Sequence, residues 1–158
     1  MKNLLNYKEL IIDTEPLLIL LVGIYDTKKL SRVSGKTEDF NYIVQLLRLY
    51  KKGIVTPQIL AEVSNHAQNQ LKGNFPDFID KVLSYLKILD EKYVCKDKLL
   101  NKIKEIKDFG ISDVSLIEIS NENRLILTKD KDFLYYCKNK NMPVVSYKDL
   151  AFYSSIKT

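Results

Sequence analysis

Cysteine, glycine and proline are all scarce in this 158-residue chain, which contains two, five and four of them respectively. The two cysteines, Cys95 and Cys137, are isolated and form no CxxC or Cys/His spacing. We therefore expect two reduced thiols, since the spacing indicates neither a disulfide framework nor a zinc site. The low glycine and proline content, with no repeats, also argues against a low-complexity chain.

The chain also lacks an apolar run long enough to span a membrane, which needs about 20 such residues. The nearest candidate, residues 9–24 (ELIIDTEPLLILLVGI), is interrupted by Asp13, Glu15 and Pro16. A secretory signal would have a basic start before its apolar stretch, whereas acidic residues precede this one. We therefore expect a cytoplasmic protein with no membrane segment.

The length and composition of the chain predict one globular domain over residues 1–158. Hydrophobic residues make up 46% and charged residues 28% of the chain, which is enough apolar material for a packed core. The formal net charge is +5. This mildly basic balance is compatible with a polyanionic partner such as a nucleic acid.

Short apolar runs alternate with longer amphipathic stretches along the chain. The short runs each end in a polar residue and predict buried strands at residues 10–13, 53–56, 125–128 and 143–146. The longer stretches have apolar residues three and four apart and predict helices at residues 16–23, 38–53, 57–73, 77–89 and 96–110. A polar stretch, residues 26–40, predicts a loop. Strands separated by helices predict an α/β fold, a three-layer α/β/α sandwich around a parallel sheet.

Two aspartates lie where predicted strands end. Asp13 closes the first apolar run, and Asp130 follows the run at 125–128. Ligands of an open parallel sheet bind at the carboxyl ends of its strands, so both positions favour a site. Each residue also has a simpler explanation, since Asp is a preferred helix cap and a helix is predicted after each of them.

Two further acids lie on predicted helices. Glu62 falls at the margin of the apolar stripe of the helix at 57–73, which Thr56 is expected to cap. Asp113 faces the apolar side of a helix for which Ser112 is the expected cap. Taken alone, Glu62 fits a solvated helix residue, and Asp113 fits a residue that complements the helix dipole.

The four acids together favour a metal site. Carboxylates that converge at one edge of a sheet repel each other and raise each other's proton affinity. A hard divalent cation, Mg²⁺ or Mn²⁺, is the simplest compensation because these ions prefer oxygen ligands. The sequence therefore predicts a metal site formed by Asp13, Glu62, Asp113 and Asp130.

Four segments, in chain order, resemble the signature segments of the PIN-domain family: LIIDTEPLLILLVG, IVTPQILAEVSNH, FGISDVSLIEIS and LILTKDKDF. The most specific features are the strand-final Asp-Thr, the Thr-Pro-x-x-x-x-Glu helix start, and Thr-x-Asp-x-Asp-Phe after a strand. The family comprises metal-dependent nucleases with an α/β/α sandwich and includes the VapC-like toxins of toxin–antitoxin pairs. The resemblance covers nearly the whole chain.

This resemblance implies a Mg²⁺- or Mn²⁺-dependent endoribonuclease, a hydrolase in which metal ions polarise the scissile phosphate and activate water. It implies that the same four acids form the site and that Thr128 lies beside them, where its hydroxyl could orient a water. Asp132 is implied as a lesser candidate, further from the metal. The resemblance also implies a homodimer and, for a toxin, an antitoxin partner.

The chain departs from the family pattern in two places. Glu15 stands where the family often has Asn or Ser, and it either helps to bind metal or is a solvated bystander. The predicted loop at 26–40 is longer than in compact toxin-like members, which disfavours the toxin specifically.

Three residues near the predicted site are candidates for substrate contacts. His66 follows Glu62 by one helical turn and could contact substrate, although a partly buried structural histidine is the simpler interpretation. Lys129 and Lys131 flank Asp130 and are candidates for phosphate contacts.

Two other classes of function remain open at this point. The same fold could bind RNA or a protein without cleaving anything, although the complete set of acids argues against this. A phosphotransferase-like enzyme with Asp13 as nucleophile would need a second aspartate two residues later, where Glu15 stands, and is therefore disfavoured.

Overall fold

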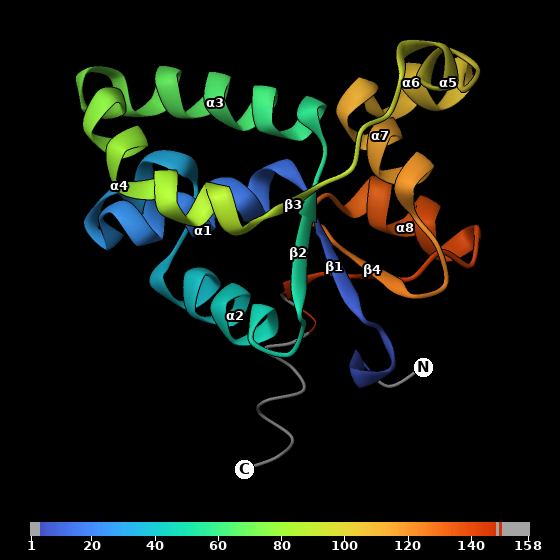
Figure 1. The fold of residues 1–158 in the computed structure, drawn as a ribbon, viewed down its shortest axis with the longest axis horizontal. Helices are drawn as coiled ribbons and strands as arrows, with labels where there is room; N and C mark the ends of the chain where they lie inside the picture. The colour runs from blue at the N-terminus through green and yellow to red at the C-terminus, as the bar shows by residue number, and fades with distance from the viewer. Residues whose placement is uncertain (1–3, 148, 150–158) are drawn as a thin grey trace.

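The computed structural model describes residues 4–147 and 149, and at its centre lies a five-stranded parallel sheet (Figure 1). The strand order is β3-β2-β1-β4-β5, and all neighbouring pairs are parallel. The strands are β1 Glu9–Ile12, β2 Lys52–Val55, β3 Asp90–Glu91, β4 Arg124–Leu127 and β5 Val144–Val145. The predicted α/β class and its four strands are confirmed, with small differences at the strand ends. The sequence does not predict β3.

Helices cover both faces of this sheet. Figure 1 shows it between a group formed by α1 to α4 and a group formed by α5 to α8, which is the predicted three-layer sandwich. The α-helices are α1 Thr14–Tyr25, α2 Thr37–Leu47, α3 Pro57–Leu71, α4 Phe75–Ile88, α5 Lys96–Leu100, α6 Ile103–Phe109, α7 Ile111–Ile119 and α8 Lys131–Asn139. Short 3-10 segments are η1 Leu4–Asn6, η2 Thr27–Val33 and η3 Lys72–Asn74.

Three predicted elements differ from the structure. The single helix predicted at 96–110 is two helices, α5 and α6, separated at residues 101–102. The loop predicted at 26–40 contains η2 and the first turn of α2. The helix predicted at 38–53 ends earlier, at Leu47. Gly53, the predicted helix end, lies within β2 instead.

The later part of the apolar run at residues 9–24 forms α1, the central helix of the core. Residues 16–23 of α1 are all buried, so this helix is apolar around its whole circumference. A Cβ atom at Gly23 would lie 2.2 Å from the Phe40 ring, so the close packing of α1 on α2 requires glycine there. Within residues 4–147 and 149, no helix has both the length and the apolar character that crossing a membrane requires.

The register of the strands determines which side chains meet at the carboxyl end of the sheet. In β1, Ile12 pairs with Leu127 of β4. The ladder continues one step further, because the Asp13 amide donates to the Leu127 carbonyl at 3.0 Å. The Thr128 amide in turn donates to the Val145 carbonyl at 3.1 Å. Asp13 and Thr128 are therefore held side by side, just beyond two adjacent strands.

Candidate functional site

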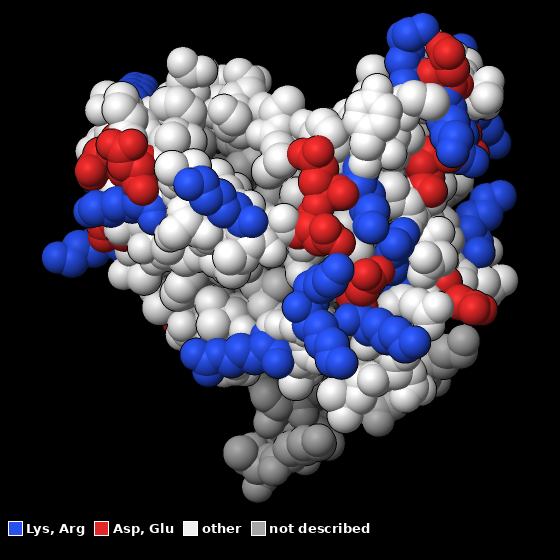
Figure 2. Space-filling model, viewed as in Figure 1, with Lys and Arg blue, Asp and Glu red and all other residues white. Residues whose placement is uncertain are grey.

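The four predicted acids come from four different elements and line one cleft. Asp13 precedes α1, Glu62 lies on α3, Asp113 lies in the first turn of α7, and Asp130 precedes α8. The cleft has a volume of about 350 Å³, and its lining includes all four carboxylates. Figure 2 shows the molecule hollowed along its upper edge, between the lobe of α3 and the lobe of α5 to α7. The structure thus brings together residues up to 117 positions apart (130 minus 13).

Asp13 is the most deeply buried of these acids, with 5% of its surface exposed. Its Oδ1 accepts a hydrogen bond from the Thr14 amide, and its Oδ2 accepts one from the Thr128 hydroxyl, both at 2.6 Å. The pKa of the Asp13 carboxyl is raised to about 6. Burial is the largest cause, the two hydrogen bonds oppose the rise, and the charges of Glu62 and Asp130 add to it. Asp13 is therefore both the cap of α1 and a member of the acid group.

Asp113 is the acid whose protonation the fold perturbs most. Burial is the largest cause, followed by the negative charges of Asp13, Asp130 and Glu62, and together they raise the pKa of the Asp113 carboxyl to about 8. Its carboxylate forms no hydrogen bond or ion pair with a described residue that would offset these effects. Asp113 is therefore largely protonated at neutral pH unless a cation is present.

The start of α7 is not the one that the sequence predicts. Gly110 is the cap residue, with no side-chain hydrogen bond, and Ser112 lies inside the helix. The expected cap at Ser112 is wrong because the chain needs a positive φ, 90°, to turn from α6 into α7, and glycine adopts it without strain. In contrast, the expected Thr56 cap of α3 is confirmed by a 3.2 Å hydrogen bond from the Ile59 amide.

Both carboxylate oxygens of Glu62 contact a neighbouring side chain. Oε2 accepts a hydrogen bond from the Thr14 hydroxyl at 3.0 Å, and Oε1 lies 3.7 Å from His66 Nε2. The His66 side chain is 46% exposed and lines the cleft, so it lies where a substrate contact is possible. The sequence does not indicate a role for Thr14, although the Asp-Thr pair that contains it is one of the chain's most specific motifs.

Asp130 and Thr128 connect the acids to the end of β4. Asp130 Oδ1 accepts hydrogen bonds from the amides of Asp132 and Phe133, at 2.8 and 2.9 Å, so Asp130 caps α8 as well as lining the cleft. The fully buried Thr128 hydroxyl accepts from the Asp130 amide at 3.1 Å while it donates to Asp13. Thr128 therefore fixes the spacing between two of the four acids.

The remaining candidates divide into paired and exposed residues. Glu15 lines the cleft and forms an ion pair with Lys129, whose Nζ also donates to the Ser34 carbonyl at 3.3 Å. This pairing explains Glu15 and leaves the Lys129 side chain only 18% exposed, so the lysine is occupied by the protein itself. Lys131 and Asp132 are exposed, and neither is among the described residues that line the cleft.

The donor chemistry of the cleft suits Mg²⁺ or Mn²⁺, since all four acids offer oxygen and repel each other without a cation. The arrangement of these side chains is less complete. In the part of the chain that the structure describes, no group of three or more His, Cys, Asp or Glu side chains is arranged to hold a metal ion. The ligand types fit such an ion, whereas the side-chain positions do not by themselves form a ligand set.

Comparison of the chain with models of known protein families and with curated proteins finds no match.

Proposed function

We propose that this protein is a Mg²⁺- or Mn²⁺-dependent endoribonuclease of the PIN type. The observation that carries the proposal is the convergence of Asp13, Glu62, Asp113 and Asp130 on one cleft at the carboxyl end of a parallel sheet. Elevated pKa values of about 6 and 8 at two of these acids are typical of functional sites. The mildly basic net charge of +5 is compatible with an RNA substrate.

In this proposal, the four acids would hold a divalent cation, which would supply Lewis-acid activation of water and neutralise charge on the phosphodiester. The protein's own hydrogen bonds orient the acids. Thr128 holds Asp13, and Thr14 holds Glu62, so each hydroxyl restricts the rotation of one carboxylate. Lys129 neutralises Glu15, which keeps a fifth negative charge in the cleft from repelling the phosphate.

A second candidate is a module that binds RNA or a protein without cleaving it. The observation that favours it is the arrangement of the acids, which within the described residues forms no group able to hold a metal ion. The two candidates differ in whether a divalent cation binds in the cleft and supports hydrolysis.

Cleavage assays with mixed RNA under Mn²⁺, Mg²⁺ and chelator distinguish the two. The nuclease should cleave only with a divalent ion, and Asp113→Asn should abolish cleavage. Asp108→Asn is the matched control, since Asp108 is an exposed acid on α6 outside the cleft. Cleavage that survives chelator or Asp113→Asn would contradict the metal-dependent mechanism. Failure to cleave any RNA would favour the binding module.

Metal binding can be measured without RNA. A cation that binds only the folded protein raises the melting temperature. Mn²⁺ should therefore stabilise the wild type and Asp108→Asn but have little effect on Asp113→Asn. Equal shifts in all three proteins would place the binding site elsewhere.

A toxin of a type II toxin–antitoxin pair, active in the cytoplasm as a homodimer, is the narrower form of this proposal. A short upstream reading frame that encodes a DNA-binding antitoxin would support it. Co-expression should then abolish both cleavage and growth inhibition.

A further inference from the structure

One aromatic ring lies in the acid cleft. Phe109 is the last residue of α6, is half-buried and lines the cleft together with Asp113. No other Phe or Tyr is among the described residues of this lining. An apolar ring beside several carboxylates is unfavourable for their hydration, so its position needs an explanation.

The Phe109 ring packs against two aromatic rings of α8. Its centroid lies 5.6 Å from the ring of Phe133, at an interplanar angle of 63°, and 5.0 Å from the ring of Tyr136, at 58°. Tilted and edge-to-face contacts of this kind are favourable and restrict rotation of the ring. Phe109 is thus a rigid side chain with part of its surface open to the cleft.

The backbone also fixes the position of the ring relative to the acids. Gly110 has φ 90° and ψ 171°, and this turn leads directly into α7, where Asp113 lies. A Cβ atom at Gly110 would meet no atom within 4 Å, so the requirement for glycine is conformational rather than steric. The turn therefore places a fixed aromatic surface four residues before one of the acids.

The opposite side of the cleft is polar. His66 and Gln70 line it from α3, and both are exposed. Gln70 forms no hydrogen bond with a described residue, so its amide donors and acceptor are available. An aromatic surface on one side and the free amide of Gln70 on the other are features that bind a nucleobase.

We propose that Phe109 is a stacking platform for one nucleobase of the RNA, and that it positions the adjacent phosphate over the acids. This inference rests on the proposed function. Stacking on an aromatic ring tolerates all four bases, so Phe109 should strengthen binding without selecting a sequence. It also requires that the base be unpaired, since a base inside a duplex cannot reach the ring.

RNA oligomers with a single abasic position test the proposal. A short single-stranded RNA with hydrolysis-resistant phosphorothioate linkages is measured with Mn²⁺ by fluorescence anisotropy, and each position is made abasic in turn. Loss of one stacked base should weaken wild-type binding by roughly 5- to 150-fold, the range for one base–aromatic contact. Phe109→Leu should lose a similar factor with intact RNA and no longer respond to the abasic position. Phe109→Tyr should behave as the wild type.

Phe75→Leu is the matched control, because Phe75 is also half-buried and packs against another ring, that of Phe78, but does not line the cleft. It should retain the wild-type response to abasic positions. An abasic profile that is the same in Phe109→Leu and wild type would overturn the stacking role while leaving the nuclease intact. A wild type that binds no RNA with Mn²⁺ would overturn both proposals. Melting temperatures of all variants verify that they are folded.

Discussion

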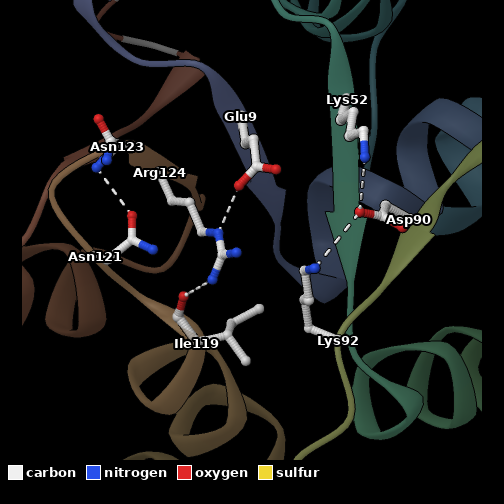
Figure 3. A network of polar contacts seen from close by, with 8 residues as sticks. All are labelled: Glu9, Lys52, Asp90, Lys92, Ile119, Asn121, Asn123 and Arg124. Carbon is white, nitrogen blue, oxygen red and sulfur yellow. Dashed lines mark hydrogen bonds and ion pairs between the residues drawn. The ribbon is translucent and has the colours of Figure 1, made fainter.

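The two ends of this parallel sheet carry charge in opposite ways. Where the strands begin, charged residues are paired: Glu9 of β1 with Arg124 of β4, and Lys52 of β2 with Asp90 of β3 (Figure 3). Where the strands end, four carboxylates share one cleft, and none forms an ion pair with a lysine or arginine of the described chain. The same sheet therefore pairs its acids with bases at one end and groups four acids without a lysine or arginine partner at the other.

Hydrogen bonds show the same contrast. Arg124 donates to Glu9 Oε2 at 2.6 Å and to the Ile119 carbonyl at 2.8 Å, so this guanidinium connects β4 to β1 and to the end of α7. At the other end, hydroxyls and amides bind Asp13 and Glu62 without neutralising them. Charge that a fold orients but leaves uncompensated is a physical indication of a functional site.

The largest expected effect comes from replacing Asp13, which directly follows β1, and is compared with replacing Glu9, which begins it. Loss of a residue that only hydrogen-bonds to a metal ligand lowers activity by roughly 10- to 100-fold. Asp13→Asn should lower the rate of RNA cleavage by more than this, because Asp13 is proposed as a ligand itself. Glu9→Gln, at the first residue of β1, should leave the rate nearly unchanged. Initial rates with Mn²⁺ test this. Similar losses in both variants would mean that Asp13 acts through the fold.

The second effect concerns stability and pH in the absence of metal. The Asp113 carboxyl has a folded pKa of about 8 against an ordinary value of 3.8. Between these values the unfolded chain has released its proton while the folded chain retains it, so the free energy of unfolding falls as pH rises. Asp13, with a folded pKa of about 6, adds to the fall over the lower part of this range.

Asp113→Asn should remove most of this slope. Near pH 8 the variant should be more stable than metal-free wild type by about 2–3 kcal/mol, less than the full pKa difference implies because solvent screens the half-buried carboxylate. Urea unfolding from pH 4 to pH 8 measures it. Asp108→Asn, outside the cleft, should follow the wild type. A less stable Asp113→Asn at pH 8 would assign Asp113 a structural role.

The sequence predicts those parts of the molecule that depend on local pattern. Four of the five strands and most helices follow from apolar periodicity. Asp13 and Asp130 follow from their places after strands, Asp113 from its place in a first helical turn, and Glu62 from its place at the margin of an apolar stripe. The strand β3 has two residues and is too short to show a periodicity. Its pairing with β2 depends on tertiary contacts, which the local sequence does not reveal. The split between α5 and α6 is not visible either, because the apolar spacing continues through it.

Contacts between distant residues are the part of the site that the sequence does not reveal. Glu15 and Lys129 are 114 residues apart, so their ion pair could not be inferred, and Lys129 therefore looked free to bind phosphate. The position of Phe109 depends on the positive φ of Gly110 and on two rings of α8. An aromatic residue directly before a glycine at a helix end is the only local signal.

The third effect is structural. Glu9→Gln should lower the free energy of unfolding by about 1–2 kcal/mol, because the Arg124 side chain is only 19% exposed and would lose its charged partner. The bond from Arg124 to the Ile119 carbonyl limits the loss. Urea unfolding at neutral pH measures it. No destabilisation would mean that solvent replaces Glu9 fully.

The smallest effect is expected at the exposed edge of the same network. Asp90 lies 3.5 Å from Lys52 and 3.8 Å from Lys92, whose side chains are 58% and 38% exposed. Exposed pairs contribute about 0–1 kcal/mol, so Asp90→Asn should cost less than Glu9→Gln. High salt should further reduce the difference between Asp90→Asn and wild type, because it screens exposed charges. An Asp90→Asn loss equal to that of Glu9→Gln, and unaffected by salt, would contradict this ranking by burial and show that β3 depends on its ion pairs.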